Sequence, residues 1–275
     1  MNFLPTLHST REFARNGLFI LFHFTGLLAL WSGVSAGAAI FAAIMYFATM
    51  FGITAGYHRY FAHRSYSTSR VFQFILALLG TISLQKGVLH WAANHRDHHR
   101  FSDKPEDIHS PVQGGFFWAH MGWIMSDKFV ETRWDRIKDF AKYPELRWLN
   151  SYWVVVFALW CVLVLSLLGF QYLVWGCFIA TTVGWHMTFC VNSLLHIWGK
   201  KAYPTGDESR NNFWLAIPTL GEAWHSNHHY FSASARQGFR WYQIDISYYV
   251  LCVLEKLGII WKVKRPPQKV LDAAT

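Results

Sequence analysis

Charged residues are missing from two long stretches of this sequence. No Asp, Glu, Lys or Arg occurs from residue 16 to residue 58, or from residue 148 to residue 199. A membrane-spanning helix needs about 20 apolar residues, so each stretch is long enough for two spans. Uncharged turns at 32–37 and near 169–172 divide the stretches. The pattern predicts an all-α membrane protein with four transmembrane helices in two hairpins, near 17–31, 37–57, 151–169 and 172–195.

Two hairpins place both chain ends and all 25 Lys and Arg residues on one side of the membrane. The positive-inside rule assigns that side to the cytoplasm. Segments 58–150 and 196–275 are therefore predicted to form a cytoplasmic helical cap within a single membrane domain, residues 1–275. The membrane is expected to be a bacterial inner membrane or the endoplasmic reticulum.

Two further apolar segments are expected to stay on the cytoplasmic side. Residues 71–84 are too few for a comfortable span and are interpreted as interfacial or re-entrant. Residues 244–261 contain three charged residues and are typical of an amphipathic helix on the headgroups. Arg11 and Arg15, which precede the first apolar stretch, also fit a cleavable signal peptide, but a retained first span is more economical.

Composition agrees with a membrane protein. Only 15% of the 275 residues are charged, against about 25% in soluble domains, and 53% are hydrophobic. The net charge of +9 suits anionic lipid or a phosphate-bearing substrate, and no nucleic-acid motif accompanies it. The four cysteines form no C-x-x-C motif and are interpreted as apolar fillers.

Histidines gather in three clusters. H-R-D-H-H places His95, His98 and His99 within an arc of about 100° on one helix face, and H-S-N-H-H repeats this spacing at His225, His228 and His229. H-R-Y-F-A-H supplies His58 and His63, which lie about 140° apart on an α-helix and are expected to straddle two metal ions.

A fourth motif, N-S-L-L-H, lies at the cytoplasmic end of the last predicted span. Asn192 and His196 are one turn apart there, which adds a ninth histidine ligand and a polar neighbour. His90, His109 and His120 are weaker ligand candidates, whereas His23 and His186 are interpreted as structural histidines within the spans.

Nine neutral imidazoles favour a borderline metal such as Fe, Zn, Cu or Ni. One ion rarely takes more than about six ligands and zinc usually takes about four, so two redox-active irons are the better interpretation. The bundle helices carry no Glu, unlike those of carboxylate-bridged di-iron proteins. Glu222 is expected to orient an imidazole through its second nitrogen, and Glu106 to be solvated.

Over roughly residues 17–262 the chain resembles the membrane fatty acid desaturases of the acyl-CoA (stearoyl-CoA delta-9) type, because all four motifs occur in that family's order. The resemblance implies a non-haem di-iron centre on the cytoplasmic side of four transmembrane helices. It implies that Asn192 supports one iron, through water, and that the iron ligands are His58, His63, His95, His98, His99, His196, His225, His228 and His229.

The resemblance also implies the reaction, an O2-dependent removal of two hydrogens from a saturated acyl chain that leaves a cis double bond, usually at delta-9. Ferredoxin or cytochrome b5 is the family's usual electron donor. The animal acyl-CoA enzymes carry arginines just before G-F-F, whereas this chain has S-P-V-Q-G-G-F-F. Acyl-CoA, acyl-lipid and acyl-carrier-protein substrates therefore stay open. Tyr46, three to four turns below His58, is predicted to form the floor of the acyl tunnel.

Two other functions remain as alternatives. A di-iron hydroxylase of fatty acyl chains or alkanes resembles this layout, but the N-S-L-L-H motif and four rather than six spans favour desaturation. A histidine-rich metal transporter would be expected to carry ionisable residues midway along several spans. Only His23 and His186 lie deep in the predicted spans, so the pattern favours an enzyme.

Overall fold

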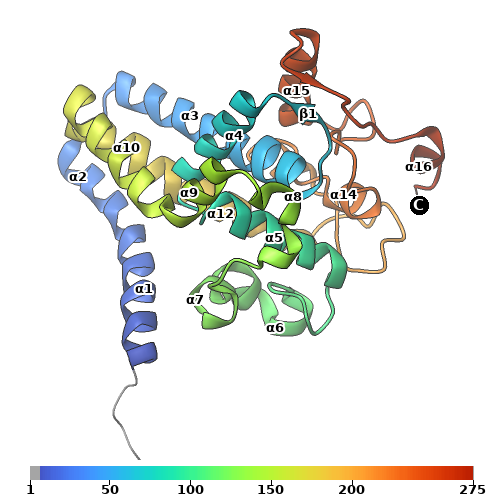
Figure 1. Cartoon of the computed structure of the whole chain (residues 1–275), viewed down its shortest axis with the longest axis horizontal. Coiled ribbons are helices and arrows are strands. Elements are labelled where there is room, and N and C mark those ends of the chain that lie inside the picture. The colour runs from blue at the N-terminus through green and yellow to red at the C-terminus, as the bar shows by residue number, and fades with distance from the viewer. Residues whose placement is uncertain (1–6, 275) are drawn as a thin grey trace, which may run out of the picture.

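The computed structural model describes residues 7–274, with side chains from Arg15 onward, and is built almost entirely of helices (Figure 1). The N-terminal half contains α1 (Leu7–Phe24), η1 (Thr25–Leu28), α2 (Ala29–Ser32), α3 (Ala36–Phe51), η2 (Gly52–Ala62), β1 (Ser67–Thr68), α4 (Arg70–Ile82), α5 (Val88–Phe101), α6 (Pro111–Phe117), η3 (Trp118–Gly122), α7 (Trp123–Met125), η4 (Asp127–Phe129) and η5 (Trp134–Arg136). The C-terminal half contains α8 (Lys138–Ala141), α9 (Pro144–Ser151), α10 (Trp153–Leu168), α11 (Phe170–Tyr172), η6 (Leu173–Ile179), α12 (Ala180–Asn192), η7 (Leu194–His196), α13 (Phe213–Ala216), α14 (His225–Tyr230), α15 (Ile246–Lys256), β2 (Ile260–Trp261) and α16 (Gln268–Asp272).

Within residues 7–274, two continuous helices are long and apolar enough to cross a membrane. They span Ala36–Ala62 and Phe170–His196, each of 27 residues, and α3 packs against α12 and η6. A third span is possible by composition if α9 and α10, which are bent by 77°, are taken together. Residues 17–31 divide among α1, η1 and α2 and do not form one apolar helix. Length and composition therefore support two or three of the four predicted spans.

The short apolar helix α4 lies against η2 and does not extend beyond Ile82. The backbones approach closely at Gly52 and Gly80, where any Cβ would overlap the neighbouring helix or the ring of Tyr57. Histidines that precede α4 and histidines that follow it meet in the folded chain, as described below. This agrees with the prediction that residues 71–84 do not cross the bilayer.

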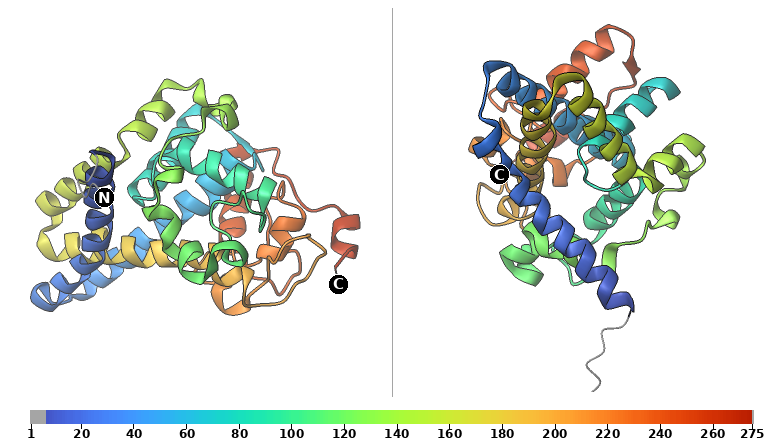
Figure 2. Two further views of the ribbon diagram at one scale, coloured as in Figure 1. Left: turned by 90° about the horizontal axis from the view of Figure 1, so that it is seen from below. Right: turned by 90° about the vertical axis from the view of Figure 1, so that its left-hand side faces the viewer.

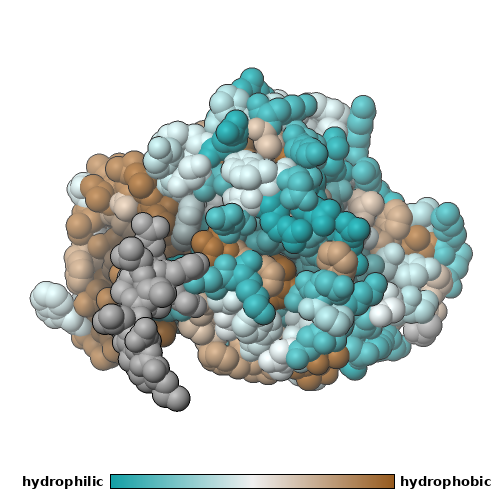
Figure 3. Space-filling view, turned by 60° about the horizontal axis from the view of Figure 1, so that its bottom comes forward, coloured by the Kyte–Doolittle hydropathy of each residue, from teal (hydrophilic) through white to brown (hydrophobic). Residues whose placement is uncertain are grey.

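Exposed apolar side chains gather at one end of the molecule. In Figure 3 the hydrophobic surface lies at the end that carries α2, α3 and α10 in Figure 1. Contiguous exposed apolar surface of this kind is typical of contact with lipid. The residues that form it include Leu30, Trp31, Ile40, Ile44, Phe47, Leu159, Val162, Leu163 and Leu167.

The C-terminal segment, with α14, α15 and α16, lies at the opposite end (Figures 1 and 2), and α14 carries three histidines. β1 pairs with β2 in antiparallel register, Ser67 with Trp261 and Thr68 with Ile260. The short helix α14 is fixed by Asn227, whose side chain bonds to Asn211 (2.7 Å) and Gln243 (2.9 Å). This segment covers the histidine site described below.

Candidate metal centre

The helix α5 presents its three motif histidines in two directions. His99 lies about 40° to one side of His95 around the helix, and His98 about 60° to the other side. His95 and His99 join one group of imidazoles, whereas His98 joins a second group. One helix therefore serves both groups.

His58 and His63 belong to the same group, so the prediction that they straddle two ions is wrong. The reason is local: η2 is a π-helix, and the backbone N–H of His63 donates to the carbonyl of His58 over 3.1 Å. Bonding between residues i and i+5 stacks residues five apart on one face, where an α-helix would separate them. Single-turn π-bulges are frequent at functional sites.

The first group, called here the five-histidine group, contains His58, His63, His95, His99 and His228. Its ring nitrogens lie within 4.8 Å of one another. Nε2 of His228 is 2.9 Å from Nε2 of His58 and 2.9 Å from Nε2 of His99. One proton on His228 cannot serve both neighbours, so this convergence fits a shared cation better than imidazole hydrogen bonds.

The second group, called here the four-histidine group, contains His98, His196, His225 and His229. His196 reaches it from the end of the second long helix, where α12 gives way after Asn192 to the tighter 3-10 helix η7. Nε2 of His196 lies 3.0 Å from Nε2 of His225. Nε2 of His98 and Nε2 of His229 are buried without a hydrogen-bond partner.

The chemistry of these nitrogens fits metal ions. Nitrogens bound to one ion at about 2.0–2.1 Å lie roughly 3 Å apart, and the Nε2 atoms of His58 and His228 and of His196 and His225 are 2.9 Å and 3.0 Å apart. Burial, followed by the charge of neighbouring histidines, lowers the pKa of His63, His95 and His99 well below the usual value. Neutral rings with lone pairs directed inward are the form that binds a metal. The two groups therefore suit two cations.

Carboxylates hold four of the nine rings through the nitrogen that faces away from the group. Glu222 contacts Nδ1 of His58 at 2.5 Å, which confirms the predicted orienting role, and Glu106 is exposed as predicted. Asp107 contacts Nδ1 of His98 (2.9 Å), Asp103 that of His196 (2.9 Å) and Asp207 that of His229 (2.7 Å). The sequence reasoning missed these three aspartates, although Asp103 and Asp107 lie four and eight residues after the last histidine of H-R-D-H-H.

The three weaker ligand candidates, His90, His109 and His120, lie in different surroundings. His109 is buried beside His98, and these two residues form a further possible metal-binding group with Asp107. His90 instead contacts the carbonyl of Phe129 at 2.8 Å, and His120 contacts Ser193 and His186. His23 is bonded to a helix carbonyl, that of Phe19, as the sequence interpretation held.

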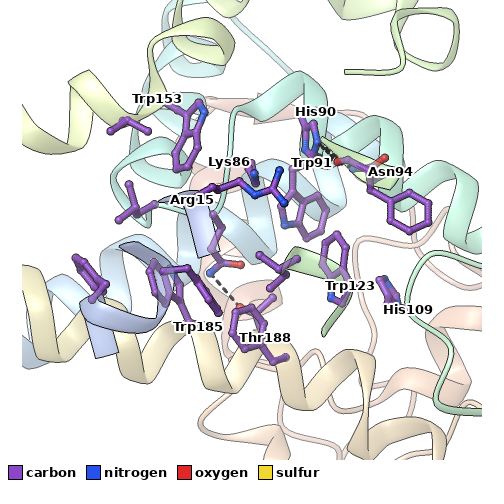
Figure 4. A pocket seen from close by; sticks show the side chains of 18 of the residues that line it. Arg15, Lys86, His90, Trp91, Asn94, His109, Trp123, Trp153, Trp185 and Thr188 are labelled. Carbon is purple, nitrogen blue, oxygen red and sulfur yellow. Dashed lines mark hydrogen bonds between the residues drawn. The ribbon is translucent and has the colours of Figure 1, made fainter. Parts of the chain in front are cut away.

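A cavity of about 640 Å³ opens beside the histidines, between α1, α5, α10 and α12 (Figure 4). Trp91, Trp123, Trp153 and Trp185 line it, together with Phe19, Phe22, Phe157 and Ala158. His95 and Asn192 lie in its wall, and both also line a second, much smaller cavity of about 30 Å³ at the metal centre. Ligand pockets usually measure about 300–1,000 Å³, so the larger cavity suits a sizeable apolar ligand.

Tyr46 is not among the residues that line either cavity. Its hydroxyl donates to the carbonyl of Pro218 instead. The structure therefore does not support Tyr46 as the floor of an acyl tunnel. In the larger cavity, Phe157 and Ala158 of α10 supply part of the apolar wall.

Comparisons with known proteins agree with this site. The sequence profile of the family described as fatty acid desaturase matches residues 31–249. The chain is 38% identical over 252 residues to the delta-9 desaturase-like 5 protein of Arabidopsis thaliana, covering 90% of this chain and 83% of that protein. It is 35% identical to the delta-9 acyl-lipid desaturase 1 of the same plant, covering 90% of this chain and 81% of that protein. It is 37% identical to the icosanoyl-CoA 5-desaturase of Limnanthes douglasii, covering 79% of this chain and 62% of that protein. The chain belongs to the fatty acid desaturase family and is an oxidoreductase of lipid metabolism.

Proposed function

We propose that this enzyme converts a saturated acyl chain into a cis-monounsaturated one at the delta-9 position. The reaction consumes one CH2–CH2 unit, one O2, two electrons and two protons, and it yields one CH=CH unit and two water molecules. The relatives carry delta-9, delta-7 and delta-5 in their names, and the first two of the three relatives described above support delta-9.

The observation that carries this proposal is that nine imidazoles converge beside an apolar cavity, with His95 of the five-histidine group in the cavity wall. We assign two irons to the five-histidine and four-histidine groups, with Asn192 supporting one iron from the cavity wall. Bound iron would supply the activation of O2. The protein holds neutral imidazoles inward and keeps water from the acyl methylenes with aromatic side chains. It also aligns the acyl chain of the substrate beside His95.

The headgroup end of the substrate is assigned to the polar part of the cavity. Arg15, Asn16, Gln85 and Lys86 line this part, and the Lys86 ammonium lies 5.5 Å from the ring centre of Trp153. Burial, followed by the charge of Arg15, lowers the pKa of Lys86 to about 8. These groups suit a carbonyl or an anionic headgroup, so both an acyl-CoA and an acyl-lipid fit the proposal.

We further propose that the chain crosses the membrane four times, with both termini and both histidine groups on the cytoplasmic side. The long charge-free stretches and the exposed apolar end of the molecule support this topology. The sequence contains no flavin, haem or iron–sulfur motif. Two electrons therefore come from a separate donor such as ferredoxin or cytochrome b5.

Product analysis after expression tests the proposal. Membranes containing the enzyme, a reductase system and O2 should convert supplied stearoyl-CoA, or the acyl chains of the host lipids, into cis-monoenes. The purified chain should contain two irons. An alcohol product would instead identify a hydroxylase, and metal uptake without any acyl product would identify a transporter. Comparing acyl-CoA with lipid-bound substrate decides the headgroup.

A further inference from the structure

The two histidine groups differ in the charge of the residues behind them. In the four-histidine group, three of the four rings are backed by an aspartate: His98 by Asp107, His196 by Asp103 and His229 by Asp207. In the five-histidine group, His58 alone is backed by a carboxylate within the described part of the chain, that of Glu222. Among the residues that the structure describes, Nδ1 of His228 has no hydrogen-bond partner, and the same holds for Nδ1 of His225 in the four-histidine group.

None of the three aspartates is paired with a Lys or Arg among the residues that the structure describes, and each side chain is exposed by 7% or less. Their other hydrogen bonds come from neutral donors. Asp103 accepts from the Ser110 hydroxyl and the Glu208 backbone N–H, and Asp107 accepts from the Asp103 backbone N–H. Asp207 accepts from the hydroxyls of Thr205 and Ser209. Three full negative charges therefore stand behind four rings.

Glu222 has a different environment, because the buried guanidinium of Arg59 contacts it at 3.1 Å. Arg59 also contacts Asp245, at 2.9 Å. One cation between two carboxylates leaves a single net negative charge near five rings. The five-histidine group has one more imidazole than the four-histidine group, but an imidazole is a neutral ligand. A carboxylate without a cationic partner carries a full charge and attracts a metal ion over a longer range.

We propose that the two metal positions are unequal, and that the four-histidine group binds ferrous iron more tightly than the five-histidine group because Asp103, Asp107 and Asp207 support its rings. This inference rests on the proposed function, since it assumes that both groups hold iron. A carboxylate behind a ligating imidazole raises the basicity of the inward nitrogen and fixes its tautomer. Loss of such a partner typically lowers metal affinity by about 10–100-fold. The aspartates are positioning residues that act through the histidines.

Iron release measures this difference without using activity. The purified full-length protein, loaded with ferrous iron under anaerobic conditions, is incubated with increasing concentrations of a ferrous chelator. Iron per chain is then determined after desalting. The wild type should lose its two irons in two separate steps, the first from the five-histidine group and the second from the four-histidine group.

Amide variants assign the steps. Asp207→Asn keeps an oxygen acceptor for His229 and removes only the charge, so the late step should move to about 10–100-fold lower chelator while the early step stays unchanged. Glu222→Gln should move the early step instead. Asp135→Asn, at a side chain that is 60% exposed, removes an unrelated surface charge and should move neither step.

The unchanged early step also shows that a variant has folded. If Asp207→Asn loses both irons together, Asp103→Asn and Asp107→Asn give independent measurements of the late step. Release of two irons in one step, or an aspartate variant that moves only the early step, would overturn this inference alone. A wild-type chain that retains no iron would overturn the proposed function as well.

Discussion

The metal centre and the acyl cavity share a wall but are built on different principles. Carboxylates hold four of the nine rings of the metal centre, and Glu222, Arg59 and Asp245 form a buried ionic network behind His58. The cavity is lined mostly by aromatic and aliphatic side chains. Side chains in the first region should tolerate almost no change, whereas side chains in the second should alter selectivity and leave the reaction intact.

The largest effect is expected for a histidine that belongs to the centre of its group. His228→Ala removes the nitrogen that lies 2.9 Å from both His58 and His99. Acyl unsaturation should fall to the background level and iron should fall by one ion per chain, both measured on purified protein. His90→Gln, at a histidine of the cavity wall outside both groups, is the matched control and should retain two irons. Full iron content in His228→Ala would contradict the statement that the metal centre tolerates almost no change.

The second effect concerns the network behind the metal centre. Arg59→Leu leaves Glu222 and Asp245 buried without their cation, which costs about 3–5 kcal/mol in the free energy of unfolding. Thermal unfolding in detergent measures this loss. Arg70→Leu removes an exposed guanidinium that pairs with Glu145, and the unfolding temperature should change little. Equal losses in the two variants would contradict the role of the buried network.

The third effect is a pH dependence to which the buried histidines of the metal centre contribute. Burial lowers the pKa of His229 to about 4, and Asp207 only partly offsets this, while an unfolded histidine titrates near about 6.5. Between these values the unfolded state binds more protons, so the stability of the metal-free protein should be complete above about pH 6.5 and decrease as the pH falls toward 4. Unfolding temperatures from pH 8 to pH 5 test this. A constant unfolding temperature would mean that the pKa of these rings is the same in the folded and the unfolded states.

The smallest effect is expected in the cavity. Ala158→Leu adds three carbons to the apolar wall and should reduce activity on the longest accepted acyl chain by about 10-fold relative to a shorter one. Competition between acyl chains of two lengths measures the ratio. Tyr46→Ala is the matched control, because Tyr46 does not line the cavity. A shift with Tyr46→Ala, and none with Ala158→Leu, would show that the chain occupies another space.

Much of the metal centre follows from the order of residues. The spacing of H-R-D-H-H and H-S-N-H-H predicted inward-facing histidines, and all nine predicted ring donors do converge. The prediction that Glu222 supports an imidazole is also confirmed. The position of His58 and His63 was wrong, because helical periodicity assumes α-geometry and a π-helix changes which residues share a face.

Other features were not accessible from the sequence. Asp207 stands 22 residues before His229, and nothing in their spacing indicates a contact. The cavity also forms only when α1, α5, α10 and α12 come together, so neither its lining nor the absence of Tyr46 from that lining could be read from one helix. Long-range contacts of this kind depend on how the elements pack and not on local pattern.

The sequence by itself determined that this chain is helical, rich in apolar segments and equipped with nine histidines in four motifs, because charge gaps and helical spacing are local properties. Only the tertiary structure decided how the rings divide into groups of five and four, which carboxylates stand behind them and where the apolar cavity meets them. Those properties depend on side chains brought together from distant parts of the chain, and packing alone sets their distances.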